Sequence, residues 1–394
     1  MSTRRPPPYS LTWDQVAAFR LARHHLSERA PGKALMVVAR DMGGAQSQLL
    51  PASQISLWSR VRDIQITDVE EAMAERKLVK AACMRRTLFL VPSRDLAIFV
   101  RGSARRAEKE IRWARGKGVP DRLIDAAIEA TLGVLDTPLT RPEIAERVSR
   151  ALGVRMQTHT GGGWGNRREL AAVSVGDLTY PVVELLHLVA ARGVICYGPK
   201  RGNEPTFVRA DAWIPHWRDV PREQAERALL RIYLQAFGPA TAADFAMWTG
   251  LNLTDAREVW AHEQAHFIPV NVEGWDAAVL REDLDALAQA DFERPLVRLL
   301  PYFDSFLLGH KERAHLVAPE HRPSVYRPQG WIVPVVLVNG RLSAVWEHAR
   351  EENRLRIKVT KFDSLSRRIV TGMRAEAQDL CRFLGLTDVD IHVS

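Results

Sequence analysis

Short helices followed by one or two short β-prone runs recur three times in the first 290 residues of this 394-residue chain. In the first group, helices opened by Thr12 and Thr67 precede runs at 78–84 and 87–91. Each threonine is followed three residues later by Gln or Glu, the capping-box spacing in which both side chains bond backbone N–H groups. A group of this composition predicts a small helical module with a two-stranded hairpin.

The second group has the same arrangement, and its helix start and its hairpin are both more clearly marked in the sequence. Thr140 and Glu143 form another capping-box pattern, and Pro142 between them suits the first turn of a helix. A hairpin is predicted from the runs 194–197 and 206–208, which flank a glycine-bearing tip with Lys200 and Arg201. The tip would project outward, as a basic wing does.

The third group is shorter. A helix is predicted at 225–237, and Thr241 caps another helix that extends through Trp248. Gly250 then makes a turn before a helix from Thr254 to Trp260, which is the helix-turn-helix pattern. A single short wing strand is expected after it. All three groups therefore fit winged-helix modules.

From residue 291 the pattern changes to strands. Asn339-Gly340 between two apolar runs predicts a hairpin, because this dipeptide suits a type I′ turn. An alternating strand at 355–362 and a helix around 373–384 follow. We therefore predict an α+β fold with a mostly-β, barrel-like C-terminal domain. The expected parts are a flexible arm at 1–9, modules at 10–118, 119–218 and 219–290, and the C-terminal domain at 291–394.

The composition bounds the class of protein. Hydrophobic residues make up 46% and charged residues 26% of the chain, as in globular proteins. It has neither a run of about 20 apolar residues nor the apolar core of a signal peptide, so no membrane partner is expected. Three dispersed cysteines suggest neither a disulfide framework nor a zinc cluster. We expect a cytoplasmic protein, a monomer because no coiled-coil segment is present, and no cofactor or metal.

The net charge of +8 favours a polyanion such as DNA, although a charge spread evenly for solubility would give the same total. Basic residues occur in two predicted loops and along one predicted helix. Residues three and four apart share a helix face, but acidic neighbours leave a solvated face as an alternative there. The predicted phosphate-contacting residues are Arg85, Arg86, Arg105, Lys109, Arg112, Lys200 and Arg201.

Two amides stand out as candidate catalytic groups. Gln46 and Gln48 would point the same way in an extended segment, since side chains alternate along a strand. An amide both donates and accepts hydrogen bonds, so the pair could hold a water molecule without carrying charge. The alternative is that both amides bond backbone groups in a turn.

Two further features have simpler interpretations. Asp304 is the one acid in the apolar run 299–309, where a turn or capping role is favoured over a buried acid with a shifted pKa. The glycine-rich stretch 160–165 matches neither phosphate-binding fingerprint. It is expected to be a flexible loop.

Three stretches together resemble the AlkZ/YcaQ family of winged-helix DNA glycosylases. They are Gly44-Ala-Gln-Ser-Gln48, the run at 84–92 that begins Met84-Arg85-Arg86, and the run at 299–309 that contains Pro301-Tyr-Phe-Asp304. The segments 319–331 and 334–346 extend the resemblance over nearly the whole chain. It implies tandem winged helices and a C-terminal β-barrel around a DNA-binding channel.

The resemblance also implies an activity, namely excision of alkylated purines and, in some members, of interstrand crosslinks made by genotoxic natural products. Gln46 and Gln48 match the catalytic Gln-x-Gln of the AlkZ branch and not the Gln-x-Asp of the YcaQ branch. Ser47 stands where an aliphatic residue is usual, Arg86 where glycine is usual and Phe89 where histidine is usual. These departures bear on local packing and on the choice of lesion.

The leading hypothesis is thus a monofunctional DNA glycosylase that hydrolyses the N-glycosidic bond of N7- or N3-alkylated purines in double-stranded DNA. No lysine lies in the Gln-x-Gln segment, so hydrolysis is expected and not Schiff-base chemistry. The alternatives are a non-enzymatic winged-helix DNA binder, such as a transcriptional regulator, and a protein-interaction scaffold. Regulators commonly read palindromes as dimers, and the scaffold hypothesis fits the basic wings less well.

Overall fold

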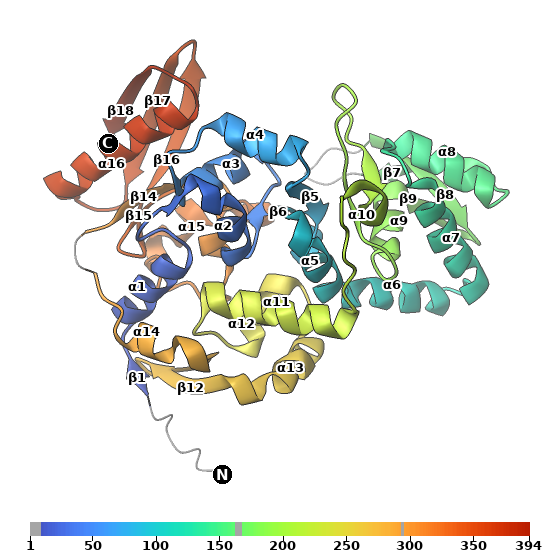
Figure 1. Ribbon diagram of the computed structural model, residues 1–394, viewed down its shortest axis with the longest axis horizontal. Helices are drawn as coiled ribbons and strands as arrows, with labels where there is room; N and C mark the ends of the chain where they lie inside the picture. Colours follow the sequence, from blue (N-terminus) through green and yellow to red (C-terminus); the bar gives the residue numbers. More distant parts are fainter. Residues whose placement is uncertain (1–8, 162–167, 293–294) are drawn as a thin grey trace. The chain divides into compact units, whose positions relative to one another are not determined.

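The computed structural model describes residues 9–161, 168–292 and 295–394, and its architecture is α+β, as predicted (Figure 1). The chain divides into two compact units. The larger unit contains Met1–Leu78, Phe89–Pro92 and Leu230–Ser394, and the smaller contains Val79–Leu88 and Ser93–Leu229. The predicted boundaries at 118, 218 and 290 define smaller parts than these units and stay predictions.

The N-terminal part of the larger unit is mostly helical. Helix α1 begins after Thr12 with the predicted capping box. Helix α4 also begins with a capping box, but its N-cap is Gln65, whose backbone N–H donates to Asp68, so the prediction of Thr67 as the cap was wrong. The elements of this part are β1 Ser10–Leu11, α1 Trp13–Arg23, β2 Ala30–Pro31, α2 Leu35–Asp41, β3 Ala45–Gln46, α3 Leu50–Trp58, β4 Val61–Arg62 and α4 Ile66–Ala74.

The chain then passes through two successive strands, β5 (Leu78–Ala82) and β6 (Leu88–Pro92), near the predicted positions. Later in the larger unit the predicted helix-turn-helix is confirmed, with Gly250 as a left-handed cap at φ 82°. Two antiparallel strands follow it where one was expected. The elements are α11 Arg222–Phe237, within which the boundary between the units falls, α12 Ala242–Thr249, α13 Leu253–His262, β12 Phe267–Val272, β13 Trp275–Leu280 and α14 Leu284–Ala288.

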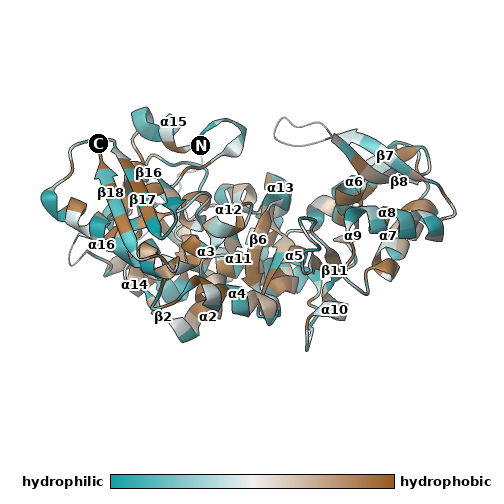
Figure 2. Ribbon diagram, turned by 90° about the horizontal axis from the view of Figure 1, so that it is seen from above, coloured by the Kyte–Doolittle hydropathy of each residue, from teal (hydrophilic) through white to brown (hydrophobic). Residues whose placement is uncertain are grey.

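The C-terminal residues form a five-stranded sheet in the order β14-β15-β16-β17-β18. The predicted hairpin is confirmed, since Asn339 and Gly340 both have positive φ between β15 and β16. Figure 1 shows α16 lying along this sheet. Exposed and buried residues alternate along β17, and Figure 2 shows hydrophilic and hydrophobic residues along this sheet. The elements are β14 Val297–Leu300, α15 Arg322–Val325, β15 Val335–Val338, β16 Arg341–Glu351, β17 Arg354–Lys361, α16 Arg367–Phe383 and β18 Asp388–Val393.

This sheet is open, so the expected barrel-like form is not confirmed by the described residues. Strand β14 pairs only with β15, and β18 pairs only with β17, in the sheet order. Apolar side chains of α16, including Met373 and Phe383, are fully buried in a core that also contains Trp58 of α3. The sheet and its helix therefore form a layer on which the N-terminal helices of the same unit pack.

The smaller unit contains the predicted Thr140 capping box and the predicted basic hairpin. It also has a three-stranded antiparallel sheet, β7-β8-β9, that the sequence analysis missed. Part of the predicted glycine-rich loop, residues 162–165, lies outside the described residues, as do residues 1–8 of the predicted arm. The elements are α5 Leu96–Gly102, α6 Arg105–Gly116, α7 Asp121–Val134, α8 Arg141–Ala151, β7 Met156–Gly161, β8 Arg168–Val175, β9 Leu178–Pro181, α9 Val182–Val189, β10 Ile195–Tyr197, β11 Phe207–Arg209 and α10 Ala210–Trp213.

Among the residues that the structure describes, none of the helices is long and apolar enough to span a membrane.

Candidate active site

The two candidate glutamines lie in a sharp connection between helices α2 and α3. Gly43 and Gly44 reverse the chain with φ of 74° and 82°. A Cβ on Gly44 would lie 2.9 Å from a methyl carbon of Val91, so glycine is needed there for packing as well as for backbone conformation. Strand β3 follows, and its Gln46 pairs antiparallel with Phe89 of β6. The local sequence thus fixes Gln46 on a short strand.

The strand ends at Gln46, and Gln48 lies in the bend that leads into α3. Gln46 is buried, with 7% of its surface exposed, whereas Gln48 is exposed. Strand alternation therefore does not by itself align the two amides. The arrangement gives one amide a fixed position and leaves the other accessible to a substrate.

Ser47, the departure from the family pattern, is fully buried between them. The Oγ of Ser53 on α3 donates to the Oγ of Ser47 at 3.0 Å and is also 2.8 Å from the carbonyl oxygen of Leu50. A buried hydroxyl needs such a partner, because leaving it without a hydrogen bond is costly. The serine at this position is thus matched by a second serine one helical turn into α3.

Replacing Ser47 with leucine, which restores an aliphatic residue, is expected to destabilise the protein by about 1–3 kcal/mol through overpacking. The larger side chain would meet the Ser53 hydroxyl in a fully buried site. Urea unfolding of Ser47→Leu and of Ser47→Leu/Ser53→Ala measures this. The double variant should recover part of the loss, and equal stability of the wild-type and Ser47→Leu proteins would contradict the packing argument.

A buried ion pair between Arg60 and Asp304 contacts α3. Both carboxylate oxygens of Asp304 accept from the guanidinium of Arg60, at 2.7 and 2.9 Å, and both side chains are fully buried. Ser56 of α3 donates to the same carboxylate at 2.6 Å. The Asp304 carboxylate also accepts from the backbone N–H of Phe306, so the predicted capping role is confirmed.

The next residue, Ser305, ties this turn to the glutamine segment. Its Oγ donates to the carbonyl oxygen of Gly44 at 2.6 Å, and both groups are buried. Two stretches that are distant in sequence, 44–48 and 299–309, therefore meet in space. Arg60 was missed by the sequence analysis, although a lone arginine in the mostly apolar stretch 55–61 could have suggested a partner for the lone acid Asp304.

The predicted DNA-contacting residues on α6 and in the β5–β6 connection differ in their surroundings. Arg86 forms ion pairs with Glu110 and Glu184. Arg105 is largely buried and forms a bidentate pair with Glu226, at 2.6 and 2.8 Å. These guanidinium groups have acidic partners in the same unit, so a phosphate would have to compete with them.

The remaining five residues of this set are more accessible or lie in turns. Arg85 is partly exposed and has a φ of 54°. Lys109 and Arg112 are exposed on α6, one turn apart. Lys200 and Arg201 are exposed at the tip of the β10–β11 hairpin, where Arg201 also bonds Glu143 and the carbonyl oxygen of Pro138. The structure brings all seven basic residues into the smaller unit and Gln46 and Gln48 into the larger one.

Within the described ranges, no group of three or more His, Cys, Asp or Glu side chains lies close enough to hold a metal ion. Serine hydroxyls, the Asp304 carboxylate and a backbone carbonyl make the hydrogen bonds that connect residues 44–47, α3 and the Asp304 turn.

A sequence model of the family described as "DNA glycosylase AlkZ-like" matches residues 39–383. This range includes the glutamine segment and the Asp304 turn. The chain belongs to this family. It is therefore an enzyme of the DNA glycosylase class, a hydrolase that acts on N-glycosyl bonds.

Two comparisons extend the match over nearly the whole chain. The chain is 32% identical over 391 residues to an "Interstrand DNA cross-link repair glycosylase" from Streptomyces sahachiroi, covering 97% of this chain and 99% of the relative. Its fold is similar to that of the solved structure of Streptomyces sahachiroi DNA glycosylase AlkZ, with a TM-score of 0.80 and 29% identity. That comparison covers 98% of this chain and 100% of the other.

Proposed function

We propose that this DNA glycosylase is monofunctional and hydrolyses the N-glycosidic bond of N7- or N3-alkylated purines, with Gln46 and Gln48 as its catalytic residues. The observation that carries the proposal is the support of residues 43–48, which we call the glutamine corner. Ser305 hydrogen-bonds the carbonyl oxygen of Gly44, and the Asp304–Arg60 ion pair hydrogen-bonds Ser56 of the following helix α3. A surface side chain without a function needs no such network of buried hydrogen bonds, whereas a catalytic side chain works better when its position is fixed.

Neutral amides suffice if the substrate supplies the driving force. Alkylation at N7 or N3 gives the purine a positive charge, so the base leaves without a general acid. The enzyme then has to position a water molecule and to stabilise the oxocarbenium-like sugar with fixed dipoles. We assign the first task to both glutamines: their amide oxygens accept from the water beneath C1′, which directs its lone pair at the sugar.

We further propose that interstrand crosslinks are among the substrates. The Streptomyces sahachiroi relative is named for repair of such crosslinks, and its similarity extends over nearly the full length of both chains. The three helical groups with their strand pairs would act as winged helices on double-stranded DNA, and a single chain would suffice for binding. The accessible basic residues Lys109, Arg112 and Lys200 are the strongest candidates for phosphate contacts, and the exposed Arg201 joins them if a phosphate displaces Glu143 from its guanidinium.

Charge reversal at the hairpin tip tests the DNA-binding part. In Lys200→Glu/Arg201→Glu, the slope of log affinity against log salt should become shallower by about 1.8, because each lost phosphate contact accounts for about 0.9. Fluorescence anisotropy with an undamaged duplex at several salt concentrations measures the slope. The control Arg356→Glu/Lys358→Glu makes the same charge change on β17. An unchanged slope in the hairpin variant, or an equal change in the control, would remove the tip from the interface.

The activity itself separates the proposal from a non-enzymatic DNA binder. Purified protein incubated with N7-methylguanine-containing duplex should produce abasic sites that alkali converts to strand breaks. Without alkali the strand should stay intact, because a monofunctional enzyme leaves the backbone uncut. Binding without abasic sites would support the regulator hypothesis, and strand cleavage without alkali would contradict simple hydrolysis.

A further inference from the structure

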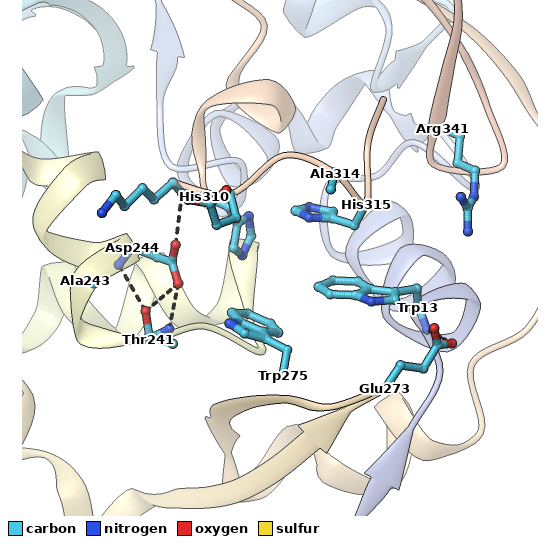
Figure 3. A pocket seen from close by; sticks show the side chains of 12 residues that line it. Trp13, Thr241, Ala243, Asp244, Glu273, Trp275, His310, Ala314, His315 and Arg341 are labelled. Atoms are coloured by element: carbon cyan, nitrogen blue, oxygen red, sulfur yellow. Dashed lines mark hydrogen bonds between the residues drawn. The ribbon is translucent and has the colours of Figure 1, made fainter. Parts of the chain in front are cut away.

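A cavity of about 570 Å³ lies in the larger unit, between the start of α1, the β12–β13 strand pair and the loop after Gly309 (Figure 3). Its walls include Trp13 and Trp275 together with His310 and His315. The residues that line it include neither Gln46 nor Gln48. The cavity is therefore a feature that the glutamine chemistry leaves unexplained.

Aromatic rings dominate this cavity. The ring of Trp13 stacks on His315 with centroids 4.6 Å apart and planes 6° apart, and on Trp275 with centroids 5.3 Å apart. His310 meets Trp275 edge-on at 6.3 Å. All four rings line the cavity, and Trp13, Trp275 and His315 are only half-buried. Trp13 is already stacked on two rings, so the surface left for a planar ligand is the exposed part of these half-buried rings. Proteins use such aromatic surfaces to stack unpaired bases.

His310 adds a directional polar group. Its side chain is buried, and within the described part of the chain its Nε2 has no hydrogen-bond partner. The ring lies against the backbone of Phe237 and Pro239. In the neutral tautomer with its proton on Nδ1, Nε2 is a hydrogen-bond acceptor. Burial also lowers the pKa of His310, which keeps the ring neutral. A ligand with an N–H group would satisfy Nε2.

The charge behind the rings selects against a cationic ligand. Arg20 is buried, donates to the carbonyl oxygens of Gly238 and Pro239, and contacts Nε2 of His315 at 3.1 Å. Burial, followed by the charge of Arg20, lowers the pKa of His315 to about 2, so His315 is neutral and accepts from the guanidinium. A second cation beside His315 would lie close to the Arg20 guanidinium and be repelled by it, although the charge of Asp244, which also acts on Arg20, offsets part of this repulsion. A neutral, unmodified base fits better than an alkylated purinium.

The rim carries both signs of charge. Lys311, Arg341, Glu273 and Glu312 are all exposed there. Arg341 also forms an exposed ion pair with Asp14 at 3.7 Å. Asp244 also lines the cavity, but its carboxylate accepts from the backbone N–H of Lys311 and from Thr241. The two cations could contact the flanking phosphates, while the near balance of charge leaves the rings and Nε2 of His310 to recognise the base.

We propose that this cavity binds an unpaired, neutral nucleobase of the DNA other than the base that is excised, by stacking on the tryptophan and histidine rings and donation of a base N–H to His310. The inference rests on the proposed function for its duplex substrate. Opening a base pair to expose one base leaves its former partner unpaired. A site for an unpaired base would stabilise that opened state.

The probe is a duplex with one bulged 2-aminopurine, whose fluorescence falls on stacking against indole, compared with the same base in a fully paired duplex. The wild-type protein should bind the bulged duplex at least about fivefold more tightly and quench its fluorescence. Ala314→Trp should abolish both effects, because Ala314 is exposed at the cavity wall and a tryptophan there fills the cavity without disturbing the core. Trp275→Ala should do the same by removing the stacking surface.

Trp260→Ala is the matched control, since Trp260 packs on Phe267 outside the cavity and its loss should leave the bulge preference unchanged. His310→Phe should bind bulged 2-aminopurine and bulged purine, which lacks the amino group, equally well. Wild-type behaviour of both Ala314→Trp and Trp275→Ala, or no bulge preference in the wild-type protein, would overturn the inference. Excision of N7-methylguanine is measured separately. If the protein prefers the bulged duplex but does not excise N7-methylguanine, the proposed function is refuted and the base-binding cavity is not.

Discussion

Excision of N7-methylguanine is expected to be about 10²–10³-fold slower in Gln48→Ala and in Gln46→Ala than in the wild-type enzyme, as when one preorganised polar group is removed from an active site. Each variant loses one of the two amides that orient the attacking water. Single-turnover release of N7-methylguanine, with enzyme in excess over the duplex, measures the chemical step.

Of the two variants, Gln48→Ala gives the cleaner result. Gln48 is exposed, so its truncation should change the free energy of unfolding by no more than about 0.5 kcal/mol. Gln46 is buried, and its alanine variant needs a parallel measurement of stability. Gln289→Ala, an exposed glutamine after α14, is the control and should excise at the wild-type rate. Wild-type rates in both Gln46→Ala and Gln48→Ala would refute the catalytic assignment.

Gln46→Glu tests whether this position needs a hydrogen-bond acceptor for water. A carboxylate of the same shape keeps the hydrogen bond to water and adds a negative charge near the developing oxocarbenium ion. If the amides only hold water, this variant should retain much more activity than Gln46→Ala. Its DNA affinity, measured by anisotropy, should stay close to that of the wild-type protein, because no basic residue changes.

Local signals predicted most of the helices and hairpins. The capping boxes at Thr12, Thr140 and Thr241 work over four residues, and the Asn339-Gly340 turn needs only two positive φ angles. Both partners of such an interaction lie within about four residues of each other, so the local sequence is enough to predict it. The missed strand β7 has five exposed residues in its six and no apolar alternation, which removes the usual strand signal.

The candidate site was predicted less completely, because its support is long-range. Gly44 and Ser305 are 261 residues apart, and Arg60 and Asp304 are 244 apart. The family resemblance identified the glutamines, yet no local pattern shows which turn holds them. The ion pairs are also long-range. In the sequence Arg105 is one of several cations on a helix face, and only the fold shows that Glu226 pairs with it.

Asp304→Ala is expected to lower the free energy of unfolding by about 3–5 kcal/mol, since it leaves the fully buried guanidinium of Arg60 without its counter-ion. Arg60→Ala should cost a similar amount by leaving the carboxylate unpaired. Urea unfolding measures both. The exposed pair between Arg356 and Glu351 is the control, and Arg356→Ala should cost no more than about 1 kcal/mol.

The double variant Arg60→Met/Asp304→Leu distinguishes stability from positioning. Replacing both partners by apolar groups removes the unpaired charge, so much of the lost stability should return. Ser56 would still lose its carboxylate acceptor, and the turn would lose the cap at Phe306. We therefore expect a stable protein whose excision rate stays at least about tenfold low, because a misplacement of catalytic groups by about 1 Å costs more than that. Full activity in this stable double variant would show that the ion pair serves folding alone and that the glutamine corner is held by other contacts.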